Sequence, residues 1–164
     1  ADDIATLAMI GAKTSRMLRN PLAEAGHGLE LAAAGRFFED AGDWERACAC
    51  WDHARQNGNL PHPHRNLVSL RLSLLYKKMA RYPEAIPLWY ELAEGANVLR
   101  AYIELAIYYE HTARDFATAL RLTATGLDLM ENRDESGWIL LKKTEDQLQR
   151  MKRRRNRLIR KLKR

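Results

Sequence analysis

Residues 37–54 read FFEDAGDWERACACWDHA, and this stretch decides the predicted fold. At its centre, Gly42 accepts the left-handed backbone that ends a helix, and Asp43 is a good cap for the next helix. Before this break, apolar residues recur three and four positions apart, as they do in helices that bury one face. The stretch therefore predicts two helices joined by a short turn, which together form a helical hairpin.

The same pattern recurs twice downstream. Residues 75–93 read LYKKMARYPEAIPLWYELA, and residues 108–127 read YYEHTARDFATALRLTATGL. In all three stretches an aromatic residue follows the break and an alanine stands three positions later; the pairs are Trp44/Ala47, Tyr82/Ala85 and Phe116/Ala119. The alanines are 38 and 34 residues apart, a spacing typical of stacked helical repeats. A helical bundle without repeats is the alternative interpretation.

These features resemble the tetratricopeptide repeat, which places small residues where helices approach closely and aromatic residues around the turn. The first repeat carries most of the pattern, at Gly35, Phe38, Gly42, Asp43, Trp44, Ala47, Trp51 and Ala54. The second keeps Tyr76, Tyr82, Ala85 and Trp89, and the third keeps Ala106, Tyr109, Phe116, Ala119 and Gly126. The resemblance spans residues 29–130 and implies an all-α fold, an α-solenoid of helical hairpins.

The remaining segments complete the predicted organisation. Residues 1–19 form a leading helix, residues 20–28 a connector, residues 29–131 three hairpins, and residues 132–164 a capping and basic amphipathic helix. The final helix itself is predicted over residues 135–163, with Trp138 sealing the last repeat. Residues 58–64, GNLPHPH, are expected to form a loop. Pro87 is expected to kink its helix or to mark a late start.

Positive charge is concentrated at the end of the chain, where residues 149–164 read QRMKRRRNRLIRKLKR. Residues 150–164 hold 10 of the 27 basic residues and no acidic residue. The other 149 residues hold 17 basic and 21 acidic residues, a net charge of −4. Any argument for a polyanionic partner is therefore an argument about this one segment.

Seven positions of the tail alternate by three and four residues and define one helix face: Leu141, Thr144, Leu148, Met151, Arg155, Leu158 and Leu162. Five of the seven are apolar, so the tail is predicted to be an amphipathic helix. Its charge favours nucleic acid as a partner, because Lys and Arg neutralise phosphates. The candidate residues are Arg153, Arg154, Arg155, Arg157, Arg160 and Lys161. A merely solvated basic face is the alternative.

Stacked hairpins form a concave surface lined by the first helix of each pair. The tetratricopeptide register implies that Glu110 and five candidate peptide-groove residues face this surface: Arg36, Lys77, Lys78, Arg100 and His111. The four cations among them suit the carboxylates of an extended peptide. Ordinary surface charge explains them equally well.

Catalytic patterns are missing from the sequence. It contains no recognisable nucleophile–base pair, phosphate-binding glycine loop or carboxylate pair. Cys48 and Cys50 point apart on a helix, and His62 and His64 lack a third metal ligand. We therefore expect no enzyme activity, metal or cofactor. The chain has no apolar run long enough to cross a membrane and no signal peptide, so a cytoplasmic location is expected.

A second resemblance concerns the context of the chain. The stretch YYEHTARDFATAL (108–120) and the basic ending are similar to the region that follows the nuclease domain in bacterial ribonuclease H-like (DEDD-type) exonuclease proteins. In that family a Tyr-Asn-x-x-Asp motif leads into an apolar helix. The opening ADDIATLAMIGA is similar to that helix, and Asp3 would match the last metal-binding aspartate, whereas the Tyr-Asn and the three other acidic ligands are absent. The resemblance implies a non-catalytic C-terminal region of a nuclease. The alternative is a free-standing adaptor that binds peptides and carries a solubilising basic cap.

Overall fold

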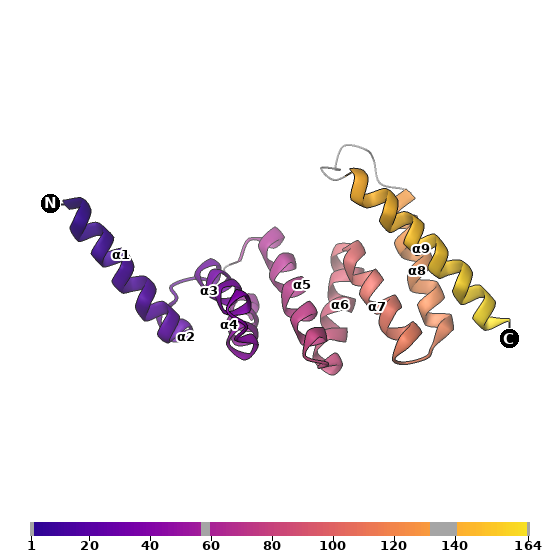
Figure 1. The fold of residues 1–164 in the computed structure, drawn as a ribbon, viewed down its shortest axis with the longest axis horizontal. Helices are drawn as coiled ribbons and strands as arrows, with labels where there is room; N and C mark the ends of the chain where they lie inside the picture. Colours follow the sequence, from indigo (N-terminus) through magenta and orange to yellow (C-terminus); the bar gives the residue numbers. More distant parts are fainter. Residues whose placement is uncertain (1, 57–59, 132–140, 164) are drawn as a thin grey trace. The chain divides into compact units, whose positions relative to one another are not determined.

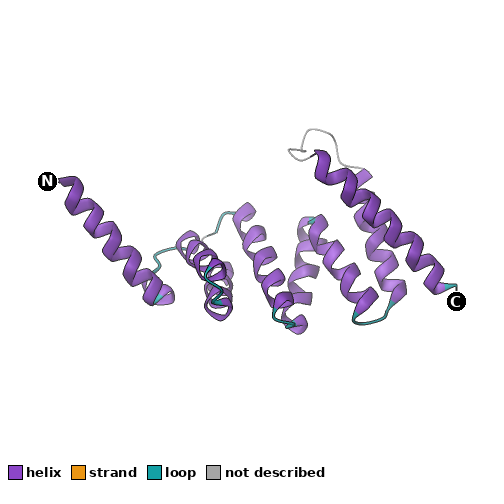
Figure 2. Cartoon of the chain, in the orientation of Figure 1, coloured by secondary structure: helices purple, strands orange, loops and turns teal. Residues whose placement is uncertain are grey.

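Helices make up the regular structure of the chain. The computed structural model describes residues 2–56, 60–131 and 141–163, and within these ranges it contains helices and no strand (Figures 1 and 2). The predicted all-α class is confirmed. The chain divides into two compact units, residues 1–85 and residues 86–164, which we describe separately. None of the described helices is long and apolar enough to span a membrane.

The first unit contains the leading helix, a short connector helix and the first hairpin. Its helices are α1 (Asp2–Arg19), α2 (Pro21–Glu24), α3 (Gly28–Asp40), α4 (Trp44–Gln56) and α5 (His62–Lys78). In addition, α6 (Tyr82–Ala96) begins here and continues into the second unit. Both α3 and α5 pack along α4. The predicted connector contains one helical turn, α2, because Pro21 at its start has a backbone preset for a helix and needs no donor there.

The close contact between α3 and α4 depends on small residues. A Cβ atom on Gly35 would overlap the indole ring of Trp51, so only glycine lets the two helices approach this closely. The same indole is fully buried, and its Nε1 donates a hydrogen bond of 3.2 Å to the carbonyl of Ala32. Ala47 and Ala54 are also fully buried along this contact. The spacing of small and aromatic residues therefore sets the packing of the hairpin.

The turns after α3, α5 and α7 share one backbone feature. Gly42, Ala80 and Arg114 have φ angles of 78°, 59° and 60°, and each lies two residues before the next helix begins. Those helices, α4, α6 and α8, begin at Trp44, Tyr82 and Phe116, the aromatic residues that follow the predicted breaks. Glycine takes this left-handed conformation freely, whereas alanine and arginine occupy it at a cost.

Two aspartates cap the helices that follow these turns. An Asp43 carboxylate oxygen accepts a 3.2 Å hydrogen bond from the backbone N–H of Arg46, which confirms the predicted cap. Asp115 accepts a 3.0 Å bond from the N–H of Thr118 in the same way. Each side chain satisfies a donor that the first turn of a helix leaves without a partner.

One sequence expectation about a proline-containing segment is wrong, and a second is wrong in one of its two alternatives. The segment predicted as a loop over 58–64 is helical from His62 onward, because Pro63 is tolerated in the first turn of α5. Residues 57–59 lie outside the described ranges. Helix α6 starts at Tyr82 and continues through Pro87, so Pro87 does not delay the start of the helix. It can lie there at the cost of one hydrogen bond within the helix.

The second unit contains the rest of α6, the hairpin of α7 (Leu99–His111) and α8 (Phe116–Glu131), and the final helix α9 (Leu141–Leu162). Helix α8 packs against both α7 and α9, much as α4 packs against both α3 and α5. Leu127 and Met130 of α8 are buried with Met151 of α9. A Cβ atom on Gly126 would stand 2.7 Å from the terminal methyl of Met151, so α8 and α9 are in contact at this glycine. The predicted start of the last helix and Trp138 fall within residues 132–140, outside the described residues.

We predict that Ala80→Gly stabilises the chain. Glycine removes the left-handed strain at this turn, and the net gain in the free energy of unfolding is expected to be about 0.5–1 kcal/mol. The reverse change in the first turn, Gly42→Ala, is expected to destabilise by a similar amount. Thermal unfolding of both variants checks the prediction, and a loss of stability in Ala80→Gly would contradict it.

We also predict that Gly35→Ala destabilises the chain by about 1–3 kcal/mol, because the rigid indole of Trp51 must move to admit a methyl group. Gly95→Ala is the matched control, since an added Cβ there meets no atom within 4 Å. Urea denaturation measures both variants. Equal stability of the two would mean that the α3–α4 contact tolerates an added methyl group.

Candidate nucleic-acid interface on the last helix

Helix α9 has one apolar side and several basic sides. Met151 and Leu158 are fully buried and Leu148 is half-buried, so the predicted apolar stripe is confirmed at these three positions. Leu162, at the end of the helix, is exposed. The side chains of Leu141 and Thr144 are not among those that the structure describes. The six candidate nucleic-acid residues of α9 fall into two groups of three. Arg154, Arg157 and Lys161 are paired internally, whereas Arg153 and Arg160 face solvent and Arg155 lies on the side of the apolar stripe.

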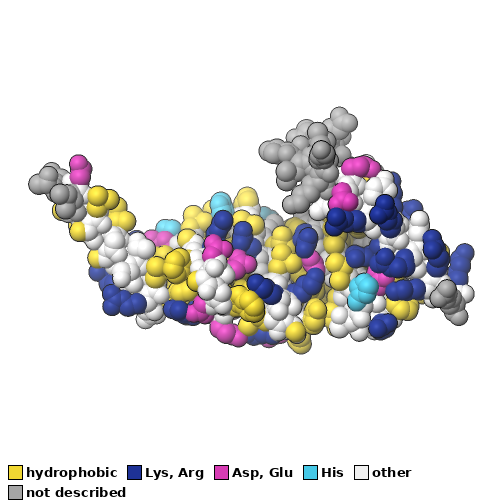
Figure 3. Space-filling view, in the orientation of Figure 1, with side chains coloured by type: hydrophobic (Ala, Val, Ile, Leu, Met, Phe, Trp, Pro, Cys, Tyr) yellow, Lys and Arg dark blue, Asp and Glu magenta, His cyan; other side chains and the backbone are white. Residues whose placement is uncertain are grey.

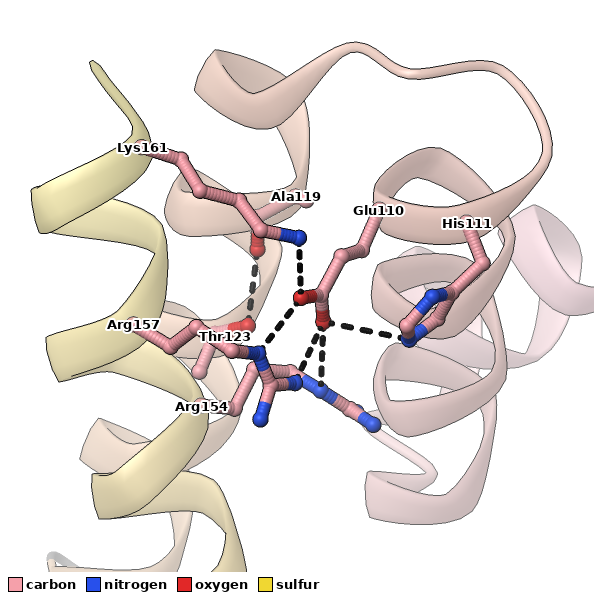
Figure 4. A network of polar contacts seen from close by, with 7 residues as sticks. All are labelled: Glu110, His111, Ala119, Thr123, Arg154, Arg157 and Lys161. Atoms are coloured by element: carbon pink, nitrogen blue, oxygen red, sulfur yellow. Dashed lines mark hydrogen bonds and ion pairs between the residues drawn. The ribbon is translucent and has the colours of Figure 1, made fainter. Parts of the chain in front are cut away.

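The first group surrounds a buried carboxylate. Glu110 comes from the last turn of α7 and is fully buried. Arg157 donates two hydrogen bonds to it, from Nε to Oε1 at 2.7 Å and from Nη2 to Oε2 at 2.8 Å. Lys161 donates a third, at 3.0 Å, to Oε1 (Figure 4). This is a two-pronged arginine–carboxylate pair reinforced by an ammonium group.

Two further groups lie beside the same carboxylate. The Nε of Arg154 is 3.3 Å from Oε2 of Glu110, and the Nε2 of His111 is 3.5 Å from the same oxygen (Figure 4). Burial lowers the pKa of Arg154, and the charge of Glu110 opposes that effect. We refer to Glu110, Arg154, Arg157 and Lys161 as the Glu110 cluster.

The cluster keeps Glu110 ionised. Burial by itself would raise the pKa of this carboxyl, but the hydrogen bonds from Arg157 and Lys161 outweigh burial and lower the pKa to about 2. Arg154, Arg157 and Lys161 are three and four residues apart, so they project from one side of α9. Because three cations meet one carboxylate, the cluster ties α9 to α7 and still retains positive charge.

Sequence reasoning missed this role of Glu110. The repeat register predicted that Glu110 lines an open groove, and this is wrong because the cations of α9 cover it. The sequence did contain one signal, the helical spacing of residues 154, 157 and 161 beside the apolar stripe. It did not indicate which acid these cations would meet.

Two of the three residues in the second group face solvent. Arg153 and Arg160 are exposed, Arg155 is half-buried, and Lys163 just beyond α9 is exposed as well. Within the described part of the chain, none of these four makes an ion pair. Figure 3 shows Lys and Arg side chains gathered over α9. We refer to Arg153, Arg160 and Lys163 as the basic face; Arg155 lies on the side of the apolar stripe.

Two other basic residues of α9 have partners. Arg150 lies 2.7 Å from Asp146 within the helix, and Lys152 lies 3.6 Å from Glu131 of α8. These pairs have exposed side chains, and such pairs are weak in water. They leave the basic face as the part of α9 whose charge has no internal counterpart among the described residues.

The candidate peptide-groove residues belong to different units. Arg36 lies 3.9 Å from Asp40, and Lys78 lies 4.3 Å above the Trp44 ring; both, like Lys77, belong to the first unit. Arg100 and His111 belong to the second unit, where Arg100 pairs with the buried Glu104 at 2.6 Å. A common groove lined by all five residues therefore remains a prediction.

Reactive groups are few in the described residues. No group of three or more His, Cys, Asp or Glu side chains among them is arranged to hold a metal ion. Cys48 and Cys50 are both free thiols, and both are buried. Their spacing on a helix predicted that they do not form a disulfide with each other. Burial raises the pKa of each thiol to about 11, so both stay protonated and unreactive near neutral pH.

Comparison with known proteins gives one partial relative. The chain is 46% identical over 61 residues to a Bacillus subtilis protein named "Uncharacterized protein YprB". The match covers 35% of this chain and 15% of the relative's length. No family model matches the chain, and no solved structure matches it.

The Glu110 cluster predicts a specific pH dependence. Glu110→Gln leaves Arg154, Arg157 and Lys161 facing a neutral amide. We expect this change to lower the free energy of unfolding by roughly 2–3 kcal/mol at neutral pH, a value that allows for solvent screening at the half-exposed Arg157. The folded pKa of about 2 lies below the ordinary value of 4.5, so the carboxylate's contribution is complete above pH 4.5 and is lost as the pH falls toward 2.

Denaturant unfolding at several pH values measures this effect. The stability difference between the wild type and Glu110→Gln should shrink steadily as the pH falls from 4.5 toward 2. Asp146→Asn, which breaks the exposed pair with Arg150, is the control and should change stability little. A difference that stays constant across this range would contradict the assignment.

Proposed function

We propose that this chain is a non-catalytic helical-repeat interaction module that binds nucleic acid through the basic face of α9. The observation that carries the proposal is the division of charge on that helix. Arg154, Arg157 and Lys161 meet an internal carboxylate, whereas the basic face has no acidic partner among the described residues. Surface cations without internal partners are available to neutralise phosphates.

We further propose that the repeats are of the tetratricopeptide type. The shared left-handed turn residue supports this, as does the contact of Gly35 with Trp51. A repeated ion pair gives independent support. Glu39, in the last turn of α3, accepts a 2.9 Å hydrogen bond from Arg71 of α5, just as Glu110 of α7 accepts from Arg157 of α9. In this arrangement α9 takes the place of the first helix of a following repeat.

The residues of the basic face are suited to contact with phosphates and not to the recognition of bases. The sequence of α9 contains no aromatic residue on which a base would stack. Arginine and lysine bind backbone phosphates without regard to sequence, so binding through this face should be non-specific and should weaken as salt rises. The Glu110 cluster has a different task, which is to fix the helix in the orientation that exposes the basic face.

The resemblance to ribonuclease H-like exonuclease proteins supplies a biological context. We propose that the chain is the C-terminal region of such a nuclease polypeptide and holds nucleic acid near the catalytic domain. DEDD-type hydrolysis requires several carboxylates that bind two metal ions, and Asp3 is the single residue that the resemblance assigns to that set. We therefore propose no hydrolytic activity for this chain by itself.

Peptide binding is the second candidate function. On α3, Phe37 and Leu29 are large apolar side chains that remain exposed beside Arg36. Exposed apolar residues next to a cation suit a peptide with apolar and acidic side chains. The binding experiment below distinguishes the candidates, because a peptide adaptor with a solubilising cap would show no salt-dependent affinity for oligonucleotides.

We predict that the variant Arg153→Gln/Arg160→Gln/Lys163→Gln binds nucleic acid more weakly than the wild type. The wild type should bind labelled oligonucleotides with a dissociation constant of roughly 10⁻⁴–10⁻⁶ M, the range of non-specific binding. In the variant, the slope of log affinity against log salt concentration should fall by about 2–3, one for each lost phosphate contact. Arg154 and Arg157 are left unchanged because they hold Glu110.

A charge-matched variant is the control. Arg19→Gln/Arg65→Gln/Arg121→Gln removes three exposed cations that lie outside α9. It should keep most of the wild-type salt slope, because the contacts come from α9. Fluorescence anisotropy at several salt concentrations measures both variants, and circular dichroism verifies that they fold. Equal salt slopes in the two variants would rule out the basic face as the binding surface.

A further inference from the structure

A cleft lies between α7 and α9, beside the Glu110 cluster. Its volume is about 220 Å³. The residues that line it are Arg100, Ile103 and Ile107 of α7 together with Gln147, Arg150, Met151 and Arg154 of α9. All seven belong to the second unit, and none belongs to the basic face.

The cleft combines an apolar lining with cationic groups. Ile103 and Met151 belong to the apolar cluster shared by α7, α8 and α9, and Ile107 extends this apolar surface along α7. Guanidinium groups come from both helices, and Arg100 and Arg150 are well exposed at the ends of flexible side chains. The lining is therefore suited to a ligand with an apolar body and a negative charge beside it.

The arginines of the cleft retain donors for such a ligand. Arg100, Arg150 and Arg154 each lie beside one carboxylate, at 2.6, 2.7 and 3.3 Å respectively. A guanidinium has five N–H donors, and one carboxylate accepts at most two of them in a forked pair.

The size of the cleft limits what can enter. A volume of about 220 Å³ is below the 300–1,000 Å³ range of pockets for drug-sized ligands, so it suits a single small group. A nucleobase is flat and largely apolar on its faces, and guanidinium planes stack on such faces. In a duplex the faces of the bases are covered by their neighbours, so only an unstacked base of a single strand is able to enter.

We propose that this cleft binds one unstacked base of a single-stranded nucleic acid, while Arg100 and Arg150 contact the phosphates on either side of that base. The inference rests on the proposed function, because the basic face would bind the rest of the backbone. It adds a preference that the basic face lacks. Phosphate contacts hold any strand, whereas the cleft selects strands whose bases are free.

The experiment compares three labelled probes at one salt concentration: an oligothymidylate of about 15 nucleotides, a strand of the same length whose residues are abasic, and a duplex of the same length. The abasic strand keeps the phosphates and removes the bases. Stacking of one base typically contributes about 1–3 kcal/mol, which corresponds to a factor of roughly 5–150 in affinity. We expect the wild type to bind oligothymidylate at least about fivefold more tightly than the abasic strand or the duplex.

The test variant is Gln147→Trp/Arg150→Gln. The tryptophan fills the cleft from its rim, and the second change removes an arginine whose partner, Asp146, is exposed. Arg100 and Arg154 stay, because they balance the buried Glu104 and Glu110. The matched control is Gln149→Trp/Arg121→Gln, which makes the same kinds of change at two exposed positions that line neither the cleft nor the basic face.

The outcomes separate the cleft from the basic face. The test variant should lose the preference for oligothymidylate, to a ratio near one, and the control should keep it. Salt-dependent binding by the wild type with no preference among the probes would overturn the cleft and leave the basic face standing. Binding of none of the probes by the wild type would overturn both. A labelled acidic, leucine-containing peptide tests the other occupant. If it binds the wild type and loses affinity in the test variant, while the ratio of oligonucleotide affinities stays unchanged, the cleft binds peptides and the inference is overturned.

Discussion

Burial of the Glu110 carboxylate is the constraint on which the second unit depends. A buried charge without partners is unfavourable by many kcal/mol, and here the partners come from a helix whose hydrogen-bonding residue Arg157 lies 47 residues away in the sequence. Once Arg157 and Lys161 have met this carboxylate, the rotation and register of α9 are fixed. The apolar stripe then faces α8, and Arg153 and Arg160 must face solvent. One buried acid therefore decides which cations of α9 serve folding and which remain available for a ligand.

Small residues and ion pairs have complementary tasks in both units. Gly35 lets α3 and α4 approach closely, and Gly126 lies where α8 meets Met151 of α9; such contacts are nonpolar and carry little information about register. Glu39 and Glu110, in the last turns of α3 and α7, each receive an arginine from the helix that follows the hairpin. An ion pair of this kind has one correct partner position, so it selects one register among several that would bury similar apolar area.

Local patterns in the sequence predicted the helices, the hairpin turns and the small-residue contacts. Trp44 begins its helix because Gly42 and Asp43 before it are suited to a turn and a cap, and that information is local. The roles of Ala80 and Arg114 were not predictable in this way, since neither residue type favours the left-handed backbone that the turn imposes on it. Long-range pairing was equally hidden. In the sequence, the cations at 154, 157 and 161 cannot be told apart from those at 153 and 160. Only the fold shows that the first three lie beside Glu110 of α7.

The outward charge of α9 also bears on how copies of this chain meet each other. Without α9, helix α8 would present the apolar surface of Leu127 and Met130, and a second copy could pack there. Helix α9 covers that surface and presents cations instead. Two such surfaces brought together would repel each other over a distance set by the ionic strength, about 10 Å at 0.1 M salt. Self-association through this surface of α9 is therefore opposed by a barrier that weakens as salt is added.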